Sequence, residues 1–149
     1  MKQFSLPLMM CGTILTLLLT ACSAPSPTTA TPTPMPAGLS GMVSGRVEVG
    51  GYELYYKCIG QRSPTVILEA GGPSDSTYWD LVMLYYAEAS RICAYDRANL
   101  GLSDKAPKPR TFEDMTRDLH TLLVNAPIEG PYILVGWSMG GDLVRLFAS

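Results

Sequence analysis

Histidine is nearly absent from this chain of 149 residues, which contains His120 and no other. An excess of one charge is also lacking: 11 basic and 13 acidic residues give a net charge of -2, and no basic cluster occurs. Nucleic-acid surfaces concentrate lysine and arginine, so we expect no nucleic-acid partner. The glycine-rich segment 136–141 lacks the lysine of a phosphate-binding loop, which excludes that kind of site.

The N-terminal segment has the pattern of a secretory signal. A charged start is followed by a short apolar stretch that ends before Cys22, and we assign residues 1–21 to the signal. The sequence Leu19-Thr20-Ala21-Cys22 resembles the lipobox of bacterial lipoproteins. This resemblance implies cleavage before Cys22 and lipid attachment to its sulfur. A plain signal peptide with a chance cysteine, or an uncleaved anchor, are the alternatives.

Residues 22–41 are rich in proline and threonine and predict a semi-extended tether that forms no packed core. Five of the chain's 12 prolines lie there: Pro25, Pro27, Pro32, Pro34 and Pro36. Lipid, tether and a globular domain over residues 42–149 together predict a protein outside the cytoplasm, anchored by lipid to a bacterial membrane.

The remaining sequence alternates predicted strands and helices, which indicates an α/β fold with a mostly parallel sheet. It begins with an N-terminal antiparallel hairpin turning at Gly50-Gly51. Thr77 with Asp80, and Thr111 with Asp114, predict two helix N-caps. The predicted strands are 46–49, 52–59, 65–69, 91–96 and 132–135, and helices are expected after Thr77, after Thr111 and from 141.

The segment Gly136-Trp137-Ser138-Met139-Gly140 follows an apolar strand and precedes a predicted helix. Strand, G-x-S-x-G and helix form the pattern of a nucleophile elbow, in which the serine hydroxyl is exposed on a sharp turn. The helix that starts there directs free N–H groups and its positive dipole end toward the same point. Ser138 is therefore the candidate nucleophile.

A serine nucleophile needs a base, and the sequence offers no suitable one. His120 precedes Ser138, whereas elbow enzymes order their residues as serine, then acid, then histidine. Asp142 lies one turn from the serine and is a poor candidate for the acid. We expect His120 to be a partly exposed helical residue without a catalytic role, and we interpret the chain as a fragment.

Three motifs resemble the N-terminal half of α/β-hydrolase-fold proteins, truncated after the nucleophile elbow. They are residues 68–73, where the family usually has His-Gly-x-Pro, residues 95–104, which match Tyr-Asp-Arg-x-Gly-x-Gly-x-Ser, and the elbow itself. The resemblance implies that Ser138 is the nucleophile and that the backbone N–H groups of Gly72 and Met139 form the oxyanion hole.

The chain departs from the family pattern at two positions. Ala70 replaces the usual histidine, which removes a side chain but no N–H group. Asn99 replaces a usual glycine, and asparagine tolerates left-handed backbone better than most residues. The resemblance also implies that the polar residues after the fourth strand hold their loop and take no part in catalysis: Asp96, Arg97, Ser103 and Asp104.

In this family the strand that holds Cys58 lies beside the strand that holds Cys93. The resemblance therefore implies a Cys58–Cys93 disulfide, which an oxidising compartment would preserve. Two buried free thiols are the alternative.

The function implied is that of a serine hydrolase outside the cytoplasm, acting on a small-molecule ester or related acyl bond, with no metal or cofactor. Peptidases that remove N-terminal proline, lactonases and cofactor-free haloperoxidases share this half of the fold and stay open. A different class is also open, in which a non-catalytic surface lipoprotein carries a degenerate hydrolase-like domain. The membrane is the second expected partner, through the lipid anchor.

Overall fold

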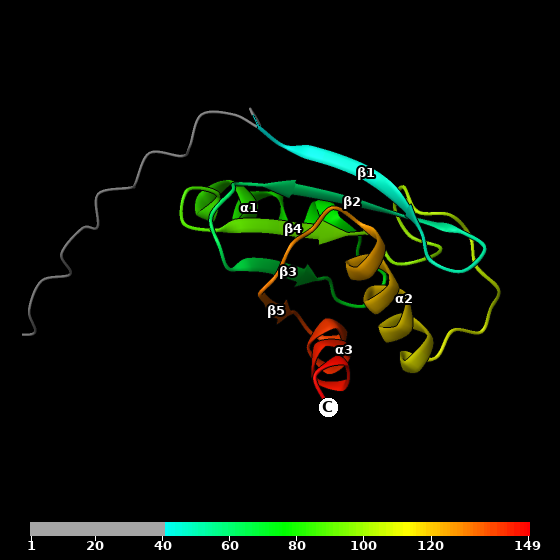
Figure 1. Ribbon diagram of the computed structural model, residues 1–149. Helices are drawn as coiled ribbons and strands as arrows, with labels where there is room; N and C mark the ends of the chain where they lie inside the picture. Colours follow the sequence, from blue (N-terminus) through cyan, green and yellow to red (C-terminus); the bar gives the residue numbers. More distant parts are fainter. Residues whose placement is uncertain (1–40) are drawn as a thin grey trace, which may run out of the picture. The chain divides into compact units, whose positions relative to one another are not determined.

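The computed structural model describes residues 41–149 (Figure 1). The predicted signal segment, Cys22 and the tether up to residue 40 lie outside the described residues. Among the residues described, no helix is long and apolar enough to cross a membrane. The elements are β1 (Val43–Glu48), β2 (Glu53–Ile59), β3 (Thr65–Glu69), a 3-10 turn η1 (Ser76–Trp79), α1 (Asp80–Tyr86), β4 (Arg91–Tyr95), α2 (Phe112–Asn125), β5 (Tyr132–Gly136) and α3 (Met139–Phe147).

The five strands form one mixed sheet in the order β1-β2-β4-β3-β5. β1 and β2 pair as the predicted antiparallel hairpin, and β2 pairs antiparallel with β4. β3 lies between β4 and β5 and is parallel to both. The carboxyl ends of these three strands therefore meet at one edge of the sheet, where Ala70, Asp96 and Trp137 follow. This arrangement confirms the predicted fold class.

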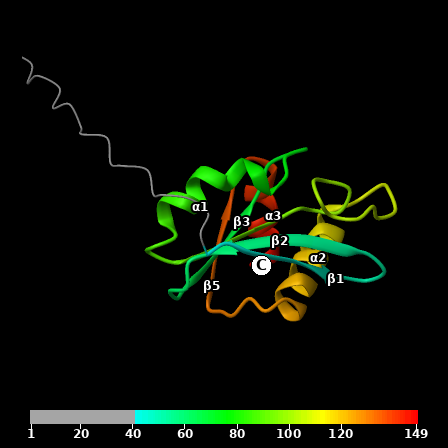
Figure 2. The ribbon, with the colours of Figure 1, turned by 90° about the horizontal axis from the view of Figure 1, so that it is seen from above.

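The helices cover the two faces of the sheet separately (Figure 2). On one face, Leu119 and Leu122 of α2 pack on Ile67 of β3, and Phe147 of α3 joins this cluster. On the other face, Trp79 and Met83 of η1 and α1 pack on the opposite side of β3 and β4. Strand β3, the centre of the parallel part, is covered on both faces, as its nearly continuous apolar sequence predicts.

Cys58 and Cys93 occupy directly opposed positions on β2 and β4. Their sulfur atoms form a disulfide that closes a sequence separation of 35 residues, and both residues are buried. The bond joins the hairpin to the parallel part of the sheet.

One predicted N-cap is confirmed and the other is wrong. At α2, the Thr111 hydroxyl accepts a hydrogen bond from Asp114 N–H, and the Asp114 carboxylate accepts one from Thr111 N–H. At the earlier helix, Asp75 is the cap of a 3-10 turn that precedes α1. Its carboxylate accepts hydrogen bonds from both the N–H and the hydroxyl of Thr77, so the Thr77 side chain is engaged as a donor and caps nothing.

Candidate active site

The turn from β5 to α3 places Ser138 in a strained conformation. Its φ is 53° and its ψ is -126°, outside the regions that residues with a side chain commonly adopt. Such a backbone costs about 1–3 kcal/mol, and the surrounding structure must impose it. Two hydrogen bonds do so from either side: Trp137 N–H donates to Glu69 O at 3.2 Å, and Gly141 N–H donates to Ser138 O at 2.8 Å.

The two outer glycines of the elbow are required by close backbone contacts. A Cβ on Gly136 would lie 2.2 Å from Gly140 O, and a Cβ on Gly140 would lie 2.4 Å from Glu69 O. Both distances are below those that real Cβ atoms show, and the opposing atoms are backbone. α3 therefore starts directly against the end of β3, which brings Ser138 beside the loop that follows β3. A Cβ built on Gly71 of that loop would lie 3.2 Å from Ser138 Cβ.

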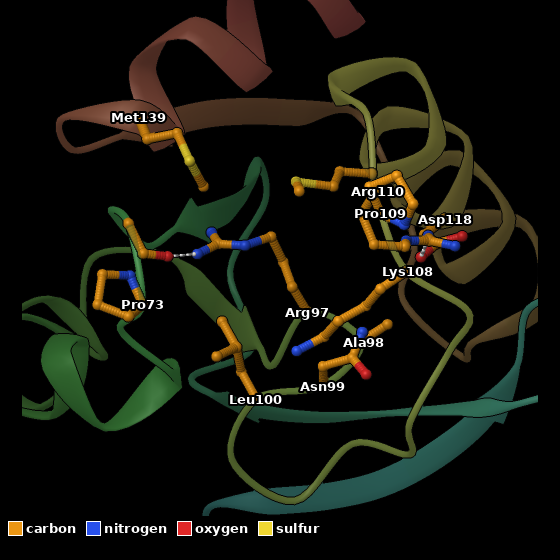
Figure 3. Close-up of a pocket in the computed structure, with 12 residues that line it drawn as sticks. Pro73, Arg97, Ala98, Asn99, Leu100, Lys108, Pro109, Arg110, Asp118 and Met139 are labelled. Atoms are coloured by element: carbon orange, nitrogen blue, oxygen red, sulfur yellow. Dashed lines mark hydrogen bonds and ion pairs between the residues drawn. The ribbon is translucent and has the colours of Figure 1, made fainter.

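Gly72 and Met139 lie on the wall of one cavity of about 370 Å³ (Figure 3). Within residues 41–149, neither backbone N–H donates a hydrogen bond to another protein atom. Ser138 is exposed, and its side chain makes no capping hydrogen bond at the N-terminus of α3 within the part of the chain that the structure describes. The first N–H groups of this helix and its positive dipole end are thus open to a negatively charged group.

The opposite wall of the cavity comes from the loop before α2 and from α2 itself, as Figure 3 shows for Lys108, Arg110 and Asp118. Sequence reasoning missed this wall, because nothing in a polar loop of this kind indicates which part of the fold it approaches. The lining residues that carry no charge are Gly72, Pro73, Ala98, Asn99, Leu100, Pro109, Met115 and Met139.

Asp118 is the carboxylate that lines this cavity, and it is already engaged. It accepts a hydrogen bond from the Tyr52 hydroxyl at 2.6 Å and forms an ion pair with Arg110. Burial, followed by the hydrogen bond to Asp118, raises the pKa of Tyr52 above its usual value. This cluster joins α2 to the hairpin and leaves the carboxylate committed to protein partners.

Arg97, which follows β4, is buried beneath the loop after β3. Its guanidinium forms an ion pair with Glu69 and donates to the carbonyl oxygens of Ala70 at 2.6 Å and Gly71 at 2.9 Å. The Tyr95 hydroxyl donates to the other oxygen of Glu69. Burial raises the pKa of Glu69, against the opposing pull of Arg97. Burial also raises the pKa of Tyr95 well above 10. Sequence analysis expected Arg97 to hold its own loop, whereas it holds the neighbouring one.

The other polar residues after β4 hold their own loop and also connect it to η1 and β2. The Asp96 carboxylate accepts hydrogen bonds from the N–H groups of Ser76 and Leu102, both at 2.7 Å. Ser103 donates to Asp96 O, and Asp104 accepts from Glu53 N–H at 2.9 Å. The φ of Asn99 is 73°, which confirms that asparagine supplies the left-handed backbone here.

His120 lies far from the elbow. Its ring is exposed on α2 and faces Phe147, with 6.4 Å between the ring centroids. Phe147 ends α3 and Ser138 precedes its first residue, so the length of the helix, about 13 Å at 1.5 Å per residue, separates the two ends. This position confirms the exposed, helical placement expected for His120. In the described part of the chain, no group of three His, Cys, Asp or Glu side chains could hold a metal ion.

Known proteins resemble this chain in sequence. A proline iminopeptidase of Lactobacillus helveticus (strain DPC 4571) is 31% identical over 113 residues, which cover 71% of this chain and 38% of that protein. The probable transporter efuK of Hormonema carpetanum is 37% identical over 107 residues, which cover 68% of this chain and 15% of that protein. The chain therefore spans well under half the length of these relatives.

Solved structures resemble it in fold. The bromoperoxidase of Bacillus anthracis matches with a TM-score of 0.65 and 29% identity, over 72% of this chain and 39% of that one. The epoxide hydrolase VrEH1 of Vigna radiata matches with a TM-score of 0.66, over 74% of this chain and 36% of that one; at 19% identity it shows the fold alone.

The sequence profile of the alpha/beta hydrolase fold matches residues 64–149, which is more than half of the chain. The match begins at β3 and includes the loop after it, the loop after β4, and the elbow. The chain belongs to the alpha/beta hydrolase family.

Proposed function

We propose that this chain carries the nucleophile and oxyanion hole of a serine hydrolase that cleaves an ester or related acyl bond. The observation that supports this most directly is the strained Ser138 at the uncapped N-terminus of α3, beside a cavity lined by Gly72 and Met139. Strain of this kind concentrates at functional sites. N–H groups that make no hydrogen bond within residues 41–149 and belong to residues lining one cavity suit the negative charge that develops during acyl transfer.

In the proposed reaction, Ser138 Oγ attacks the carbonyl carbon of the substrate, and the N–H groups of Gly72 and Met139 stabilise the resulting oxyanion. The oxyanion then collapses, the alcohol leaves with the proton that came from the serine, and water hydrolyses the acyl-enzyme. A histidine from outside residues 41–149 carries that proton, because His120 lies at the far end of α3. The small share of its relatives that the chain spans is consistent with this requirement.

We also propose that the protein works outside the cytoplasm, attached to a membrane through lipid on Cys22. The lipobox-like sequence before Cys22 supports this, as does the Cys58–Cys93 disulfide, since such bonds persist in oxidising compartments. Fractionation of cells that express Cys22→Ala tests it. We expect the variant to leave the membrane fraction, and a variant that stays membrane-bound would contradict lipid attachment.

A fluorophosphonate probe tests the catalytic proposal, because it reacts with an activated serine and not with an ordinary one. We expect the natively expressed protein to be labelled and Ser138→Ala to lose the label. Ser149→Ala is the matched control: this serine is also exposed, its hydroxyl bonds only the carbonyl of Leu146 within the described residues, and labelling should persist.

A second candidate function is favoured by the position of His120, which leaves Ser138 without a base among residues 41–149. It is a non-catalytic surface lipoprotein that uses the hydrolase-like domain for binding. Absence of labelling in the folded wild-type protein would support this alternative and contradict the hydrolase. If labelling occurs, turnover of short-chain esters compared with N-terminal prolyl substrates would identify the bond that is cleaved.

A further inference from the structure

We propose that Arg97 is a positioning residue for the oxyanion hole, which it orients by binding the carbonyl side of the peptide whose N–H belongs to Gly72. This inference rests on the proposed function, because an oxyanion hole has meaning only for an acyl-transfer reaction. It goes beyond the proposed function by assigning a role to a residue that is neither the nucleophile nor an oxyanion donor, and that follows a different strand from both N–H donors.

The peptide geometry connects Arg97 to the donor. The bond between Gly71 and Gly72 is trans, so the carbonyl of Gly71 and the N–H of Gly72 point in opposite directions within one plane. Arg97 Nη2 donates to that carbonyl at 2.9 Å from beneath the loop. A carbonyl fixed toward the buried guanidinium directs the N–H of Gly72 away from it. Figure 3 shows the Arg97 side chain reaching the strand end beside Pro73, within the wall of the cavity.

The hydrogen bonds from the Arg97 guanidinium reach the carbonyl oxygens of three consecutive residues. Arg97 Nη1 donates to Ala70 O at 2.6 Å, and Nη2 also donates to Gly72 O, so three successive carbonyls share one guanidinium. A planar fork with five donors can span such a set, whereas the ammonium of lysine presents its donors from one point. The loop therefore depends on the shape of arginine and not only on its charge.

A backbone turn holds the same peptide together with Arg97, because Ser74 N–H also donates to Gly71 O, at 3.1 Å. Side chains do not confine Gly72: among residues 41–149, no atom lies within 4 Å of a Cβ built on this residue. Ala70 also offers no polar side chain that could bind the loop. Glu69 and Arg97 are 1% and 5% exposed, and their pairing keeps the buried guanidinium compensated while its remaining donors face the loop. A buried ion pair by itself is weak evidence for a stabilising role. In the proposal, this pair instead orients the loop that carries Gly72.

Arg97→Lys in the full expressed chain tests the proposal, with Arg46→Lys as the matched control. Arg46 likewise pairs with carboxylates and donates to a loop carbonyl, that of Leu102, but its hydrogen bonds within residues 41–149 go to Glu53, Leu102 and Asp104 and not to the loop after β3. We expect the rate of fluorophosphonate labelling to fall about 10²–10³-fold in Arg97→Lys, the loss typical of one oxyanion donor. For any ester that is turned over, kcat should fall while KM changes little. Arg46→Lys should label at the wild-type rate.

A structural readout separates this inference from the proposed function. The backbone amide resonance of Gly72 should shift in folded Arg97→Lys, and its hydrogen exchange should accelerate. An unshifted Gly72 amide, or wild-type labelling in a folded variant, would overturn the positioning role even if Ser138 is labelled.

If Arg97→Lys does not fold, Glu69→Gln takes its place, because it removes the paired charge and keeps an oxygen acceptor. The Gly72 amide should then shift in Glu69→Gln, and an unchanged resonance would again reject the role. If the wild type is not labelled at all, the proposed function fails, and with it the role of Arg97 in an oxyanion hole.

Discussion

The N-termini of α2 and α3 are built in opposite ways. At α2, Thr111 and Asp114 form a capping box in which each side chain accepts a hydrogen bond from the other residue's N–H group. At α3, Ser138 adopts a positive φ, its side chain makes no capping hydrogen bond within residues 41–149, and Met139, the first helical residue, lines the cavity. The capped end uses its side chains to stabilise its own helix. The uncapped end forgoes that stabilisation and keeps donors free for a ligand.

The comparison also shows what replaces a cap at α3. The glycines of the elbow allow the first turn of α3 to lie against the backbone at the end of β3, so packing fixes where the helix begins. Gly72, the other proposed donor, has open space around it, and its loop is held by hydrogen bonds to the Gly71 carbonyl from Arg97 and from Ser74 N–H. The two halves of the proposed oxyanion hole are thus held by different means, one by close packing and the other by hydrogen bonds to backbone carbonyls, chiefly from a buried guanidinium.

The largest effect is expected from Gly140→Ala, which tests whether packing fixes the start of α3. The new Cβ would lie 2.4 Å from Glu69 O and 2.7 Å from Ala70 O, both backbone atoms that cannot rotate away. Overpacking of this kind destabilises a protein by about 1–3 kcal/mol, occasionally more. Urea unfolding of the full expressed chain, followed by circular dichroism, measures the change.

Gly72→Ala is the matched control for this substitution, because it adds the same methyl group to a glycine of the neighbouring loop, on the other side of the proposed site. Its Cβ meets no atom within 4 Å, and we expect a change in stability of at most about 0.5 kcal/mol. Equal destabilisation by the two substitutions would show that the loop after β3 is packed as tightly as the elbow. That result would contradict the view that packing fixes the elbow while hydrogen bonds hold the loop.

Sequence reasoning located the elbow, the parallel strands and the capping box at Thr111, because each depends on residues close together in the chain. Strand β3 has the predicted bounds, 65–69. The cap of the earlier helix was misplaced by two residues, since both Asp75 and Thr77 are good caps and only the three-dimensional turn decides between them. A sequence pattern does not show which of two neighbouring polar residues forms the cap.

Long-range contacts were the part that sequence could not supply. The motif after β4 predicted that its polar residues hold a loop, yet which loop Arg97 holds depends on the adjacency of β3 and β4. The wall formed by Lys108 and Asp118 depends on how the loop before α2 crosses the end of the sheet. The resemblance to a known family gave the strand order needed to pair Cys58 with Cys93, which neither residue's local sequence contains.

Thr111→Ala is expected to have a smaller effect than Gly140→Ala, and it tests the capped end of the comparison. The substitution removes the hydroxyl that accepts from Asp114 N–H at 3.2 Å, and loss of such a cap destabilises by about 1 kcal/mol. Thr116→Ala is the control, because this threonine lies in the same helix and its hydroxyl donates only to the carbonyl of Glu113. Equal losses of stability in the two variants, measured by urea unfolding, would contradict a capping role for Thr111.

The smallest effect is expected from Asp114→Asn, and its dependence on pH identifies the charge at the capped end. Hydrogen bonds from Thr111, first from its backbone N–H and then from its side chain, lower the pKa of Asp114 below 3.8. The folded protein therefore binds this proton less tightly than the unfolded chain does, and the carboxylate stabilises the fold at pH values above 3.8. That stabilisation is lost as the pH falls through the lower pKa of the folded state. Because asparagine is neutral at every pH, the variant should have a lower Tm than the wild type at pH 7, and the difference should close in acid.

Glu113→Gln controls for the interaction of any first-turn carboxylate with the helix dipole, because Glu113 lies in the same turn and its side chain makes no hydrogen bond within the described residues. A Tm difference for Asp114→Asn that stayed constant from pH 7 into acid would assign its effect to side-chain shape, and the contrast between a charge-capped α2 and an open α3 would then rest on the Thr111 hydroxyl alone.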